Sequence, residues 1–404
     1  MIHKKIRGPV NVLRLEGSIS GNVKVIYFFM DYHEYPSRML NSADMMVENV
    51  DEYMENFLYR LNQKKESYYD FFVEIMLTNI INKKFKVGAR YIDKIHFLFN
   101  KLFSYDFDAK TMKIKNVGTK NLEKIRMHYV DIRDYINFGI YTNYVNILAT
   151  LNVLDTKMMT YEIDDLLDLF ISLTNNFSIF YKQIEKLYET LVKHLAKKPI
   201  MKHCDDLKEF LLEYMIYKIK YKYDDEMVRS EINEIVGELS ERLHALSNES
   251  KRVSERINEH LKAIVTNLTS GQTIMLNLVY KIKDSINLCM PIIDEFLACY
   301  SCFVDIYLLR RFLEKKYITN VIAYIGCDHG VNCIDILVKR FNFKITNACY
   351  FNATNIDDLN SKVLNGSSRT ETDKLIVPST PKNQMVDLYS FPESIVCVPE
   401  KITG

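Results

Sequence analysis

The longest regular pattern in the sequence is a seam of ten positions, spaced alternately by four and three residues, between Ile232 and Ile264. This spacing places successive side chains on one face of an α-helix, and only Ser250 and His260 interrupt its apolar character. As one helix the segment would be about 50 Å long. Two interpretations stay open: a long helical hairpin that packs on its own chain, or a coiled coil that binds a partner protein. The seam consists of Ile232, Val236, Leu239, Leu243, Leu246, Ser250, Val253, Ile257, His260 and Ile264.

The seam lies within a long stretch whose pattern is almost wholly helical, whereas β-rich runs alternate with helical patterns before and after it. Alternating strands and helices predict βα units and a parallel sheet. We therefore predict an α/β fold with a mixed, largely parallel central sheet flanked by helices, a long all-helical insertion and an extended C-terminal tail. The predicted parts are 1–135 and 316–364 for the two halves of the α/β core, 136–315 for the helical insertion and 365–404 for the tail, which is rich in Ser, Thr, Pro and Asn.

The bounds of individual strands and helices are predicted from the local hydrophobic pattern and from the glycine, proline and capping residues between them. The predicted strands are Val10–Glu16, Lys24–Met30, Tyr69–Ile75, Lys124–Arg133, Asn320–Gly326 and Lys344–Ala348. The predicted core helices run from a cap at Ser42 to Leu61, from Ala89 to Phe103, and, after a turn, from Val331 to Phe341.

Composition narrows the range of partners. Lys and Arg number 53 against 52 Asp and Glu, so no basic excess indicates nucleic acid. The basic, tyrosine-rich run Tyr217–Tyr223 is followed at once by acidic residues, which favours a solvated helix face over a nucleic-acid surface. The most apolar stretch, Ser285–Leu309, contains Pro291 and several charges, which argues against a membrane span. We expect instead a protein partner, bound through the helical arm or the C-terminal tail.

The cysteines and the N-terminus indicate a reducing compartment. Most of the 8 cysteines lie in apolar surroundings, as reduced core thiols do. Cys299 and Cys302 form a CxxC pair that resembles a redox or zinc half-site, but the pair stands alone within a helical pattern, which favours core packing. The first residues have charges without an apolar segment behind them, so no secretory signal is expected.

Polar residues suited to chemistry follow four of the predicted strands. Because the carboxyl ends of parallel strands meet at one edge of a sheet, side chains from all four are expected to line a single crevice. The candidate residues are His33, Glu74, Asp131, Arg133 and His329. Histidine and carboxylate side chains suit zinc, manganese or iron, which activate a bound water. Without a metal, the same groups provide general acid–base catalysis.

Three of these residues have structural alternatives. Glu74 directly follows Phe-Phe-Val, so its carboxylate needs a partner if it is buried, and Arg133 or Arg90 would supply one. Asp131 and Arg133 alternate with Ile132, so an extended strand end would place both on one face. There Arg133 would stabilise an anionic intermediate and Asp131 would orient a histidine. In an inactive cleft they would pair with each other or with Glu74.

The strand ends also resemble known families. Asp31-Tyr-His33-Glu-Tyr-Pro is similar to the first motif of the TraB, TIKI and erythromycin esterase-like (ChaN-related) superfamily. Phe71-Phe-Val-Glu74 resembles its second strand, and Tyr324-Ile-Gly-Cys-Asp-His329-Gly its closing motif. The runs Lys24–Tyr35 and Met127–Tyr135 resemble uncharacterised proteins of giant DNA viruses.

The superfamily resemblance implies a metal-dependent or His/Glu acid–base hydrolase with a central cleft. His33, Glu74 and His329 would then bind a divalent metal, zinc or manganese, or act as acid–base residues. One departure concerns the first motif, where Met30 replaces the usual glycine. The alternative function is a non-catalytic viral protein that keeps the fold. The resemblance to viral proteins implies a location in the host cytoplasm or in the virion.

Overall fold

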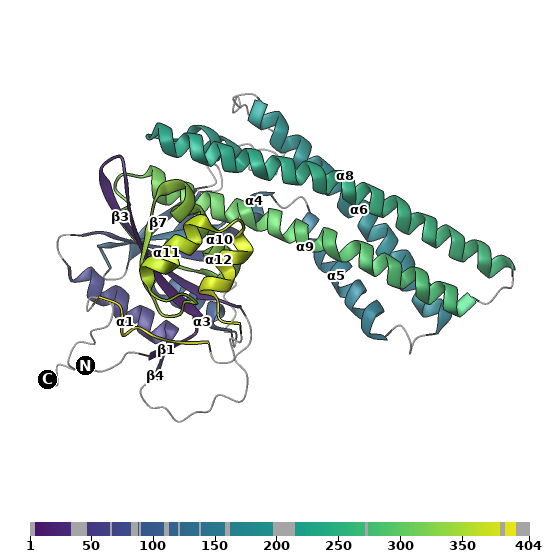
Figure 1. Cartoon of the computed structure of the whole chain (residues 1–404), viewed down its shortest axis with the longest axis horizontal. Helices are drawn as coiled ribbons and strands as arrows, with labels where there is room; N and C mark the ends of the chain where they lie inside the picture. Colours follow the sequence, from purple (N-terminus) through teal and green to yellow (C-terminus); the bar gives the residue numbers. More distant parts are fainter. Residues whose placement is uncertain are drawn as a thin grey trace. The chain divides into compact units, whose positions relative to one another are not determined.

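The computed structural model describes residues 5–33, 47–64, 67–81, 88, 90–108, 113–119, 122–136, 139–157, 162–196, 215–270, 274–379 and 384–392. Its architecture is mixed α/β, as the sequence predicts (Figure 1). The chain forms two compact units, the first from residues 1–134 and 307–404 and the second from 135–306.

The first unit is built on a six-stranded sheet with the strand order β10-β2-β3-β9-β5-β8. Four neighbouring strands, β3, β9, β5 and β8, run parallel, whereas β2 pairs antiparallel with β3 and with β10. The parallel strands therefore end at one common edge. The strands are β2 (Asn11–Ile19), β3 (Asn22–Asp31), β5 (Tyr69–Met76), β8 (Ile125–Asp131), β9 (Asn320–Gly326) and β10 (Lys344–Ala348).

Shorter strands and the helices complete this unit. The remaining strands are β1 (Lys5–Arg7), β4 (Val47–Asn49) and β11 (Met385–Asp387), which form a small sheet, and the hairpin of β6 (Phe103–Asp108) and β7 (Lys113–Thr119). The helices are α1 (Val50–Asn62), α2 (Leu77–Ile81), α3 (Tyr91–Leu102), α4 (Arg133–Ile136), which extends into the second unit, α10 (Cys327–Phe341), α11 (Ile356–Asn365) and α12 (Arg369–Ile376).

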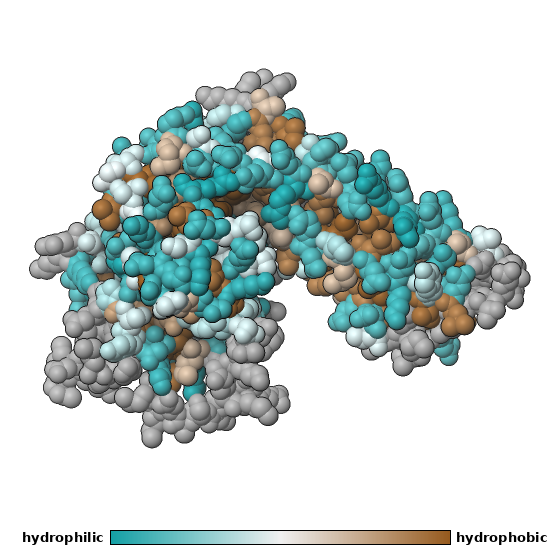
Figure 2. Space-filling view, in the orientation of Figure 1, coloured by the Kyte–Doolittle hydropathy of each residue, from teal (hydrophilic) through white to brown (hydrophobic). Residues whose placement is uncertain are grey.

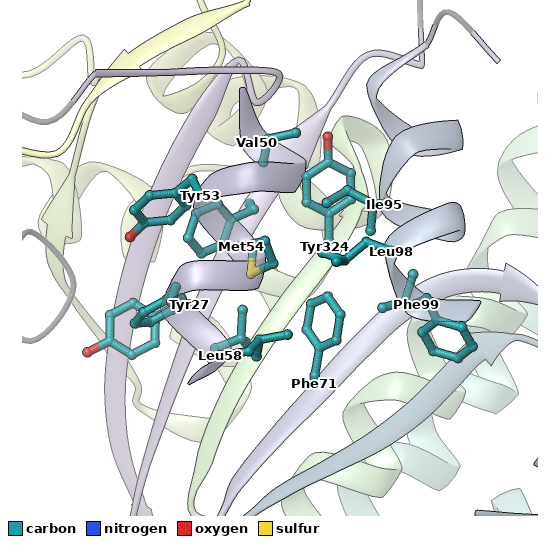
Figure 3. Close-up of a cluster of buried hydrophobic side chains, with 14 of the residues drawn as sticks. Tyr27, Val50, Tyr53, Met54, Leu58, Phe71, Ile95, Leu98, Phe99 and Tyr324 are labelled. Carbon is teal, nitrogen blue, oxygen red and sulfur yellow. The ribbon is translucent and has the colours of Figure 1, made fainter. Parts of the chain in front are cut away.

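Helices α1 and α3 cover one face of the sheet through an apolar core (Figure 3). Tyr53 and Phe57 of α1 stack with their ring centroids 5.7 Å apart, over Phe29 of β3 and Phe71 of β5. Apolar residues of α3 recur at helical spacing and are buried in the same cluster. The near-continuous apolar strands are thus explained by a sheet that is covered.

The second unit is helical, and its seam lies within one helix. The long helix α8 includes all ten seam positions, and each of them is buried. Helix α6 packs along α8, and His260 of α8 meets Ser285 of α9 with 3.1 Å between Nδ1 and Oγ. The seam therefore packs on its own chain, which supports the hairpin interpretation. The helices are α5 (Ile140–Lys157), α6 (Ile163–Ala196), α8 (Glu226–Ser270) and α9 (Ile274–Glu314), the last of which ends in the first unit.

Several boundaries differ from the sequence predictions, and three of them change the description of the first unit. Helix α1 begins at Val50, after the extended N-cap Asn49, while the expected cap Ser42 lies outside the described residues. Helix α10 begins directly after β9, at Cys327, where a turn was expected, and Gly330 lies inside the helix close to Met30. The predicted tail includes α12 and β11, and its apolar residues Ile376, Val386 and Leu388 are buried.

Among the described residues, no helix is long and apolar enough to cross a membrane. Hydrophilic side chains cover most of the face shown in Figure 2, with hydrophobic ones emerging along the helical unit. Leu276 and Tyr280, near the start of α9, are the most exposed large apolar side chains described.

Candidate functional site

The carboxyl edge of the parallel strands gathers the predicted residues, as expected. His33 follows β3, Glu74 lies near the end of β5, and Asp131 ends β8. Arg133 begins α4 and His329 lies in the first turn of α10, directly after β9. Residues up to 296 positions apart (329 minus 33) therefore converge because four parallel strands end together.

Glu74 is the centre of this cluster, and its side chain is 5% exposed. Its Oε1 accepts a hydrogen bond from Arg133 Nη2 at 2.9 Å, and its Oε2 accepts one from the backbone N–H of Gly326 at 2.7 Å. Burial alone would raise the pKa of Glu74, but His329, His33 and Arg133 together hold that pKa well below its ordinary value. The group is a stable buried anion.

Two histidines face this carboxylate at different distances. His329 Nε2 lies 3.3 Å from Glu74 Oε1, whereas His33 Nε2 lies 3.7 Å from Glu74 Oε2, beyond hydrogen-bond range. The Nε2 atom of His33 is buried and has no hydrogen-bond partner, although the side chain as a whole is 30% exposed. Burial lowers the pKa of His33 against the opposing effect of Glu74, so its imidazole is neutral at pH 7.

The backbone at His33 is unusual, with φ at 58° in the left-handed region. The backbone N–H groups of His33, Tyr32 and Ile92 lie near the Asp31 carboxylate and act to lower its pKa, although its Oδ2 atom is buried without a hydrogen-bond partner. Asp31 is buried, and burial followed by the nearby charge of Glu74 raises its pKa to about 7. The sequence analysis did not include Asp31 as a site residue. The sequence feature that could have identified Asp31 is a carboxylate directly after an apolar run, the same feature that identified Glu74.

Arg133 links the two carboxylates of the cluster. Its Nε and Nη2 donate to the two oxygens of Asp131 at 2.8 and 2.7 Å, and Nη2 also reaches Glu74. The backbone N–H of Arg133 donates to Asp131 Oδ1 at 3.1 Å, so Asp131 caps the start of α4. The strand ends at Asp131, so the predicted alternation along an extended strand is wrong here. The two side chains meet because Arg133 folds back from the helix.

His96 of α3 is a second residue that sequence reasoning missed. Its Nε2 lies 2.7 Å from the backbone carbonyl oxygen of Glu74, and because a carbonyl only accepts, Nε2 bears the proton. Burial lowers the pKa of His96, which keeps it neutral. Helix α3 is therefore bonded to the backbone of Glu74, and its first turn lies near Asp31 at Ile92. The sequence feature that could have identified His96 is a histidine within a helical pattern of apolar residues.

Two glycines allow the elements to approach. A Cβ atom on Gly326 would lie 3.1 Å from Glu74 Oε2 and 3.2 Å from His33 Cε1, so a side chain there would crowd both groups. A Cβ atom on Gly330 would lie 2.7 Å from Met30 Cγ. Met30, which replaces the glycine of the resembled motif, is thus buried against α10.

The predicted metal role of His33, Glu74 and His329 stays a prediction. Across the part of the chain that the structure describes, no group of three or more His, Cys, Asp or Glu side chains has the arrangement of a metal site. A metal ion on Glu74 would compete with Arg133, which already bonds Oε1, and with the Gly326 N–H, which bonds Oε2. The donor set suits an ion-paired carboxylate with two imidazoles better than a metal.

A second buried charge cluster lies at the opposite, amino end of the same strands. Asp70 of β5 accepts two hydrogen bonds from Arg126, at 2.9 and 2.6 Å, and one from His128 Nε2 at 2.7 Å. The other ring nitrogen of His128 accepts from Arg311 Nε at 3.0 Å. Nearby, Lys24 donates to three backbone carbonyls, those of Phe312, Lys315 and Ile318.

Comparison with known proteins places the chain in a family. A family model described as a family of unknown function, DUF5847, matches residues 4–396. The chain belongs to this family. The uncharacterised protein R706 of Acanthamoeba polyphaga mimivirus is 30% identical over 96% of both chains. The uncharacterised protein R161 of the same virus is 28% identical over 96% of this chain and 98% of its own length. No solved structure matches the chain.

Proposed function

We propose that the cluster around Glu74 is a proton-transfer site that supports hydrolysis, with His33 as the general base. The observation that carries this proposal is the state of His33. Its imidazole is neutral and partly exposed, and it faces a buried anion without being hydrogen-bonded to it. A purely structural histidine is normally hydrogen-bonded when its ring nitrogen is buried.

Each neighbour has a role in this scheme. With Nε2–H directed at Glu74, the Nδ1 atom of His33 accepts a proton from an attacking water. The imidazolium that forms is then stabilised by the Glu74 carboxylate at 3.7 Å. Arg133 keeps Glu74 ionised and fixed in place, and Asp131 holds Arg133. His329, at 3.3 Å from Glu74, is the second acid–base group of the cleft.

The resemblance to the TraB, TIKI and erythromycin esterase-like superfamily supports the same reaction class. That resemblance also supports a metal-assisted form of the proposal, in which His33, Glu74 and His329 hold zinc or manganese. In that form Arg133 would have to leave Glu74 Oε1. The two forms therefore differ in their response to chelation.

The test is a hydrolysis assay on the full chain with chromogenic acyl and phosphoryl esters. His33→Gln should lower the rate at least about 100-fold, the usual contribution of a general base. His244→Gln is the matched control, because His244 is an exposed histidine of the second unit that stacks on Tyr188. The acid–base form predicts that a chelator leaves the rate unchanged, and the metal form predicts that zinc or manganese restores a lost rate.

Equal rates in His33→Gln and the unmodified chain, or no turnover of either ester class, would contradict the proposal. A second function is favoured by one observation, the pairing of Arg133 with both Glu74 and Asp131. This is the arrangement expected of an inactive cleft. The chain would then be a non-catalytic protein of the virion or host cytoplasm that binds a protein through its helical arm or tail.

A further inference from the structure

The CxxC pair of α9 lies in a different environment from the other thiols described. Cys299 is fully buried, whereas Cys302 is partly exposed. Residues three apart in an α-helix have Cα atoms about 5 Å apart. A disulfide requires a Cα separation of about 4.4–6.8 Å, which this spacing meets, and a Cβ separation of about 3.5–4.5 Å. Residues three apart in a helix have Cβ atoms about 5–6 Å apart, so a bond between these two sulfur atoms requires a local opening of this turn of α9.

A charged pair from two helices adjoins these thiols. Arg242 of α8 donates through Nε to Glu295 Oε1 at 2.9 Å, and its Nη1 lies 3.6 Å from Cys302 Sγ. The thiol of Cys299 donates to the same Glu295 oxygen at 3.4 Å. The side chains of Arg242 and Glu295 are each 42% exposed, so solvent reaches the cluster. All four residues belong to the second unit.

We propose that Cys299 and Cys302 form a peroxide-sensitive dithiol site, in which Cys302 is the reactive thiol and Cys299 the resolving one. A guanidinium beside a thiol favours the thiolate, which is the nucleophile in thiol chemistry. Cys302 combines this neighbour with access to solvent. Cys299 is buried, which raises the pKa of its thiol although the charge of Arg242 opposes this, and it donates to Glu295, which takes up its proton.

The chemistry takes two balanced steps. The Cys302 thiol releases its proton to solvent, and the thiolate attacks a peroxide, so that an S–O bond forms, the O–O bond breaks, and the leaving hydroxide (or alkoxide) takes up that proton to give water (or an alcohol). Cys299 then gives its proton to Glu295 and attacks the sulfur of Cys302. The S–S bond forms, the S–O bond breaks, and the leaving hydroxide recovers the proton from Glu295 as water. The peroxide is the oxidant and is reduced, while the two thiols are oxidised.

The cluster differs from Cys349, the other partly exposed cysteine described. Burial raises the pKa of the Cys349 thiol, and the charged neighbour that acts on it, Asp387, raises it further. Cys349 therefore provides an internal control in the same molecule. A reagent that reacts with any exposed thiol should modify Cys302 and Cys349 at similar rates. The proposal predicts instead that Cys302 reacts faster.

The experiment treats the full chain with hydrogen peroxide, blocks remaining thiols by alkylation, and analyses peptides by mass spectrometry. Cleavage after Glu295 and Arg310 gives a peptide, 296–310, whose only cysteines are Cys299 and Cys302. This peptide should lose two hydrogen atoms instead of gaining two alkyl groups. In Cys299→Ser, Cys302 should accumulate a sulfenic acid that dimedone traps, and in Cys302→Ser no oxidation of Cys299 is expected.

The contribution of Arg242 is measured separately, by the rate at which iodoacetamide alkylates the reduced chain. Cys302 should react at least about tenfold faster than Cys349, and Arg242→Gln should lower the Cys302 rate about tenfold. Arg242→Lys keeps the charge and should lie between the two. An unchanged Cys349 rate and unchanged circular dichroism show that the variants are folded. Peptide 296–310 staying reduced under peroxide, or Cys302 reacting no faster than Cys349, would overturn the proposal.

Discussion

Strand β5 has a buried carboxylate near each end, and the two are surrounded by the same kinds of residue. Asp70 and Glu74 each have an arginine and at least one histidine beside them. At Asp70 the histidine is held at 2.7 Å and its second nitrogen is bonded to Arg311. At Glu74 the histidines stand at 3.3 and 3.7 Å, and His33 is partly exposed.

The Asp70 and Glu74 clusters contain the same kinds of side chain, and this difference indicates that they have different roles. At Asp70 the carboxylate and the imidazole of His128 are both buried and closely hydrogen-bonded, while the Arg126 side chain is 29% exposed. We therefore expect this cluster to stabilise the amino end of the sheet. At Glu74 the arginine contact is equally close, yet an imidazole is left neutral, accessible and without a hydrogen bond. Charge neutralisation alone does not require that imidazole, which is why we propose chemistry at this end and a structural role at the other.

The largest expected effect is on stability, at Asp70. Asp70→Asn leaves Arg126 without its carboxylate partner, and breaking a buried ion pair costs about 3–5 kcal/mol. Glu74→Gln should cost less, about 1–3 kcal/mol, because Arg133 keeps Asp131 as a partner. Urea unfolding followed by circular dichroism measures both. Equal losses in the two variants would remove the distinction between the two ends.

Arg133 gives the next largest effect. Arg133→Ala leaves Glu74 and Asp131, both buried, without their shared cation, and we expect a loss of about 3 kcal/mol. The double variant Arg133→Ala/Glu74→Gln removes one of the two stranded charges and should recover part of that loss. The same unfolding experiment reports both. No recovery would show that Glu74 does not depend on Arg133 for its charge.

The smallest effect is the pH dependence contributed by the two clusters. Burial, followed by the charge of Arg311, lowers the pKa of His128 from 6.5 to about 4, although Asp70 acts in the opposite direction. Between these values the unfolded chain binds more protons, so this stabilisation is complete above pH 6.5 and is lost as the pH falls towards 4. The shift corresponds to at most about 3 kcal/mol.

His128→Gln should flatten the stability profile in that pH window. His33→Gln is the matched control at the other end of the sheet. The pKa of His33 is also lowered, so its contribution to stability likewise falls as the pH falls. Because the His33 side chain is partly exposed, the change in the slope of stability against pH should be smaller than for His128→Gln. Unfolding at pH 7, 6, 5 and 4 compares the variants. A larger change of slope in His33→Gln would reverse the assignment of the two histidines.

The sequence predicts the features that periodicity and strand ends control. The seam in α8 is buried throughout, and the α/β class with a largely parallel sheet is confirmed. The convergence of His33, Glu74 and His329 follows from the parallel strand direction that was predicted and from the adjacency of β3, β9 and β5, which was not. Side-chain contacts do not follow from such rules. The pairing of Arg133 with two carboxylates depends on where β8 ends and α4 begins, which local pattern did not specify.

Other features depend on contacts between distant segments. Asp31 matters because the first turn of α3 lies against it, and Asp70 because Arg126 and His128 are adjacent in the sheet. The tail forms a helix and a strand because Ile376 and Val386 are buried by the folded unit. Local composition, rich in Ser, Thr and Pro, indicated the opposite. None of these contacts can be inferred from residues that are neighbours in the sequence.

The left-handed backbone at His33 has an evolutionary consequence. For a residue with a Cβ atom this conformation costs about 1 kcal/mol or more, and glycine adopts it without that cost. In a lineage that no longer needed the imidazole, replacing this histidine with glycine would cost little stability, because relief of the left-handed strain offsets the extra entropy that glycine loses on folding. The residue that relatives have at this turn is thus a record of whether their cleft is still under functional selection.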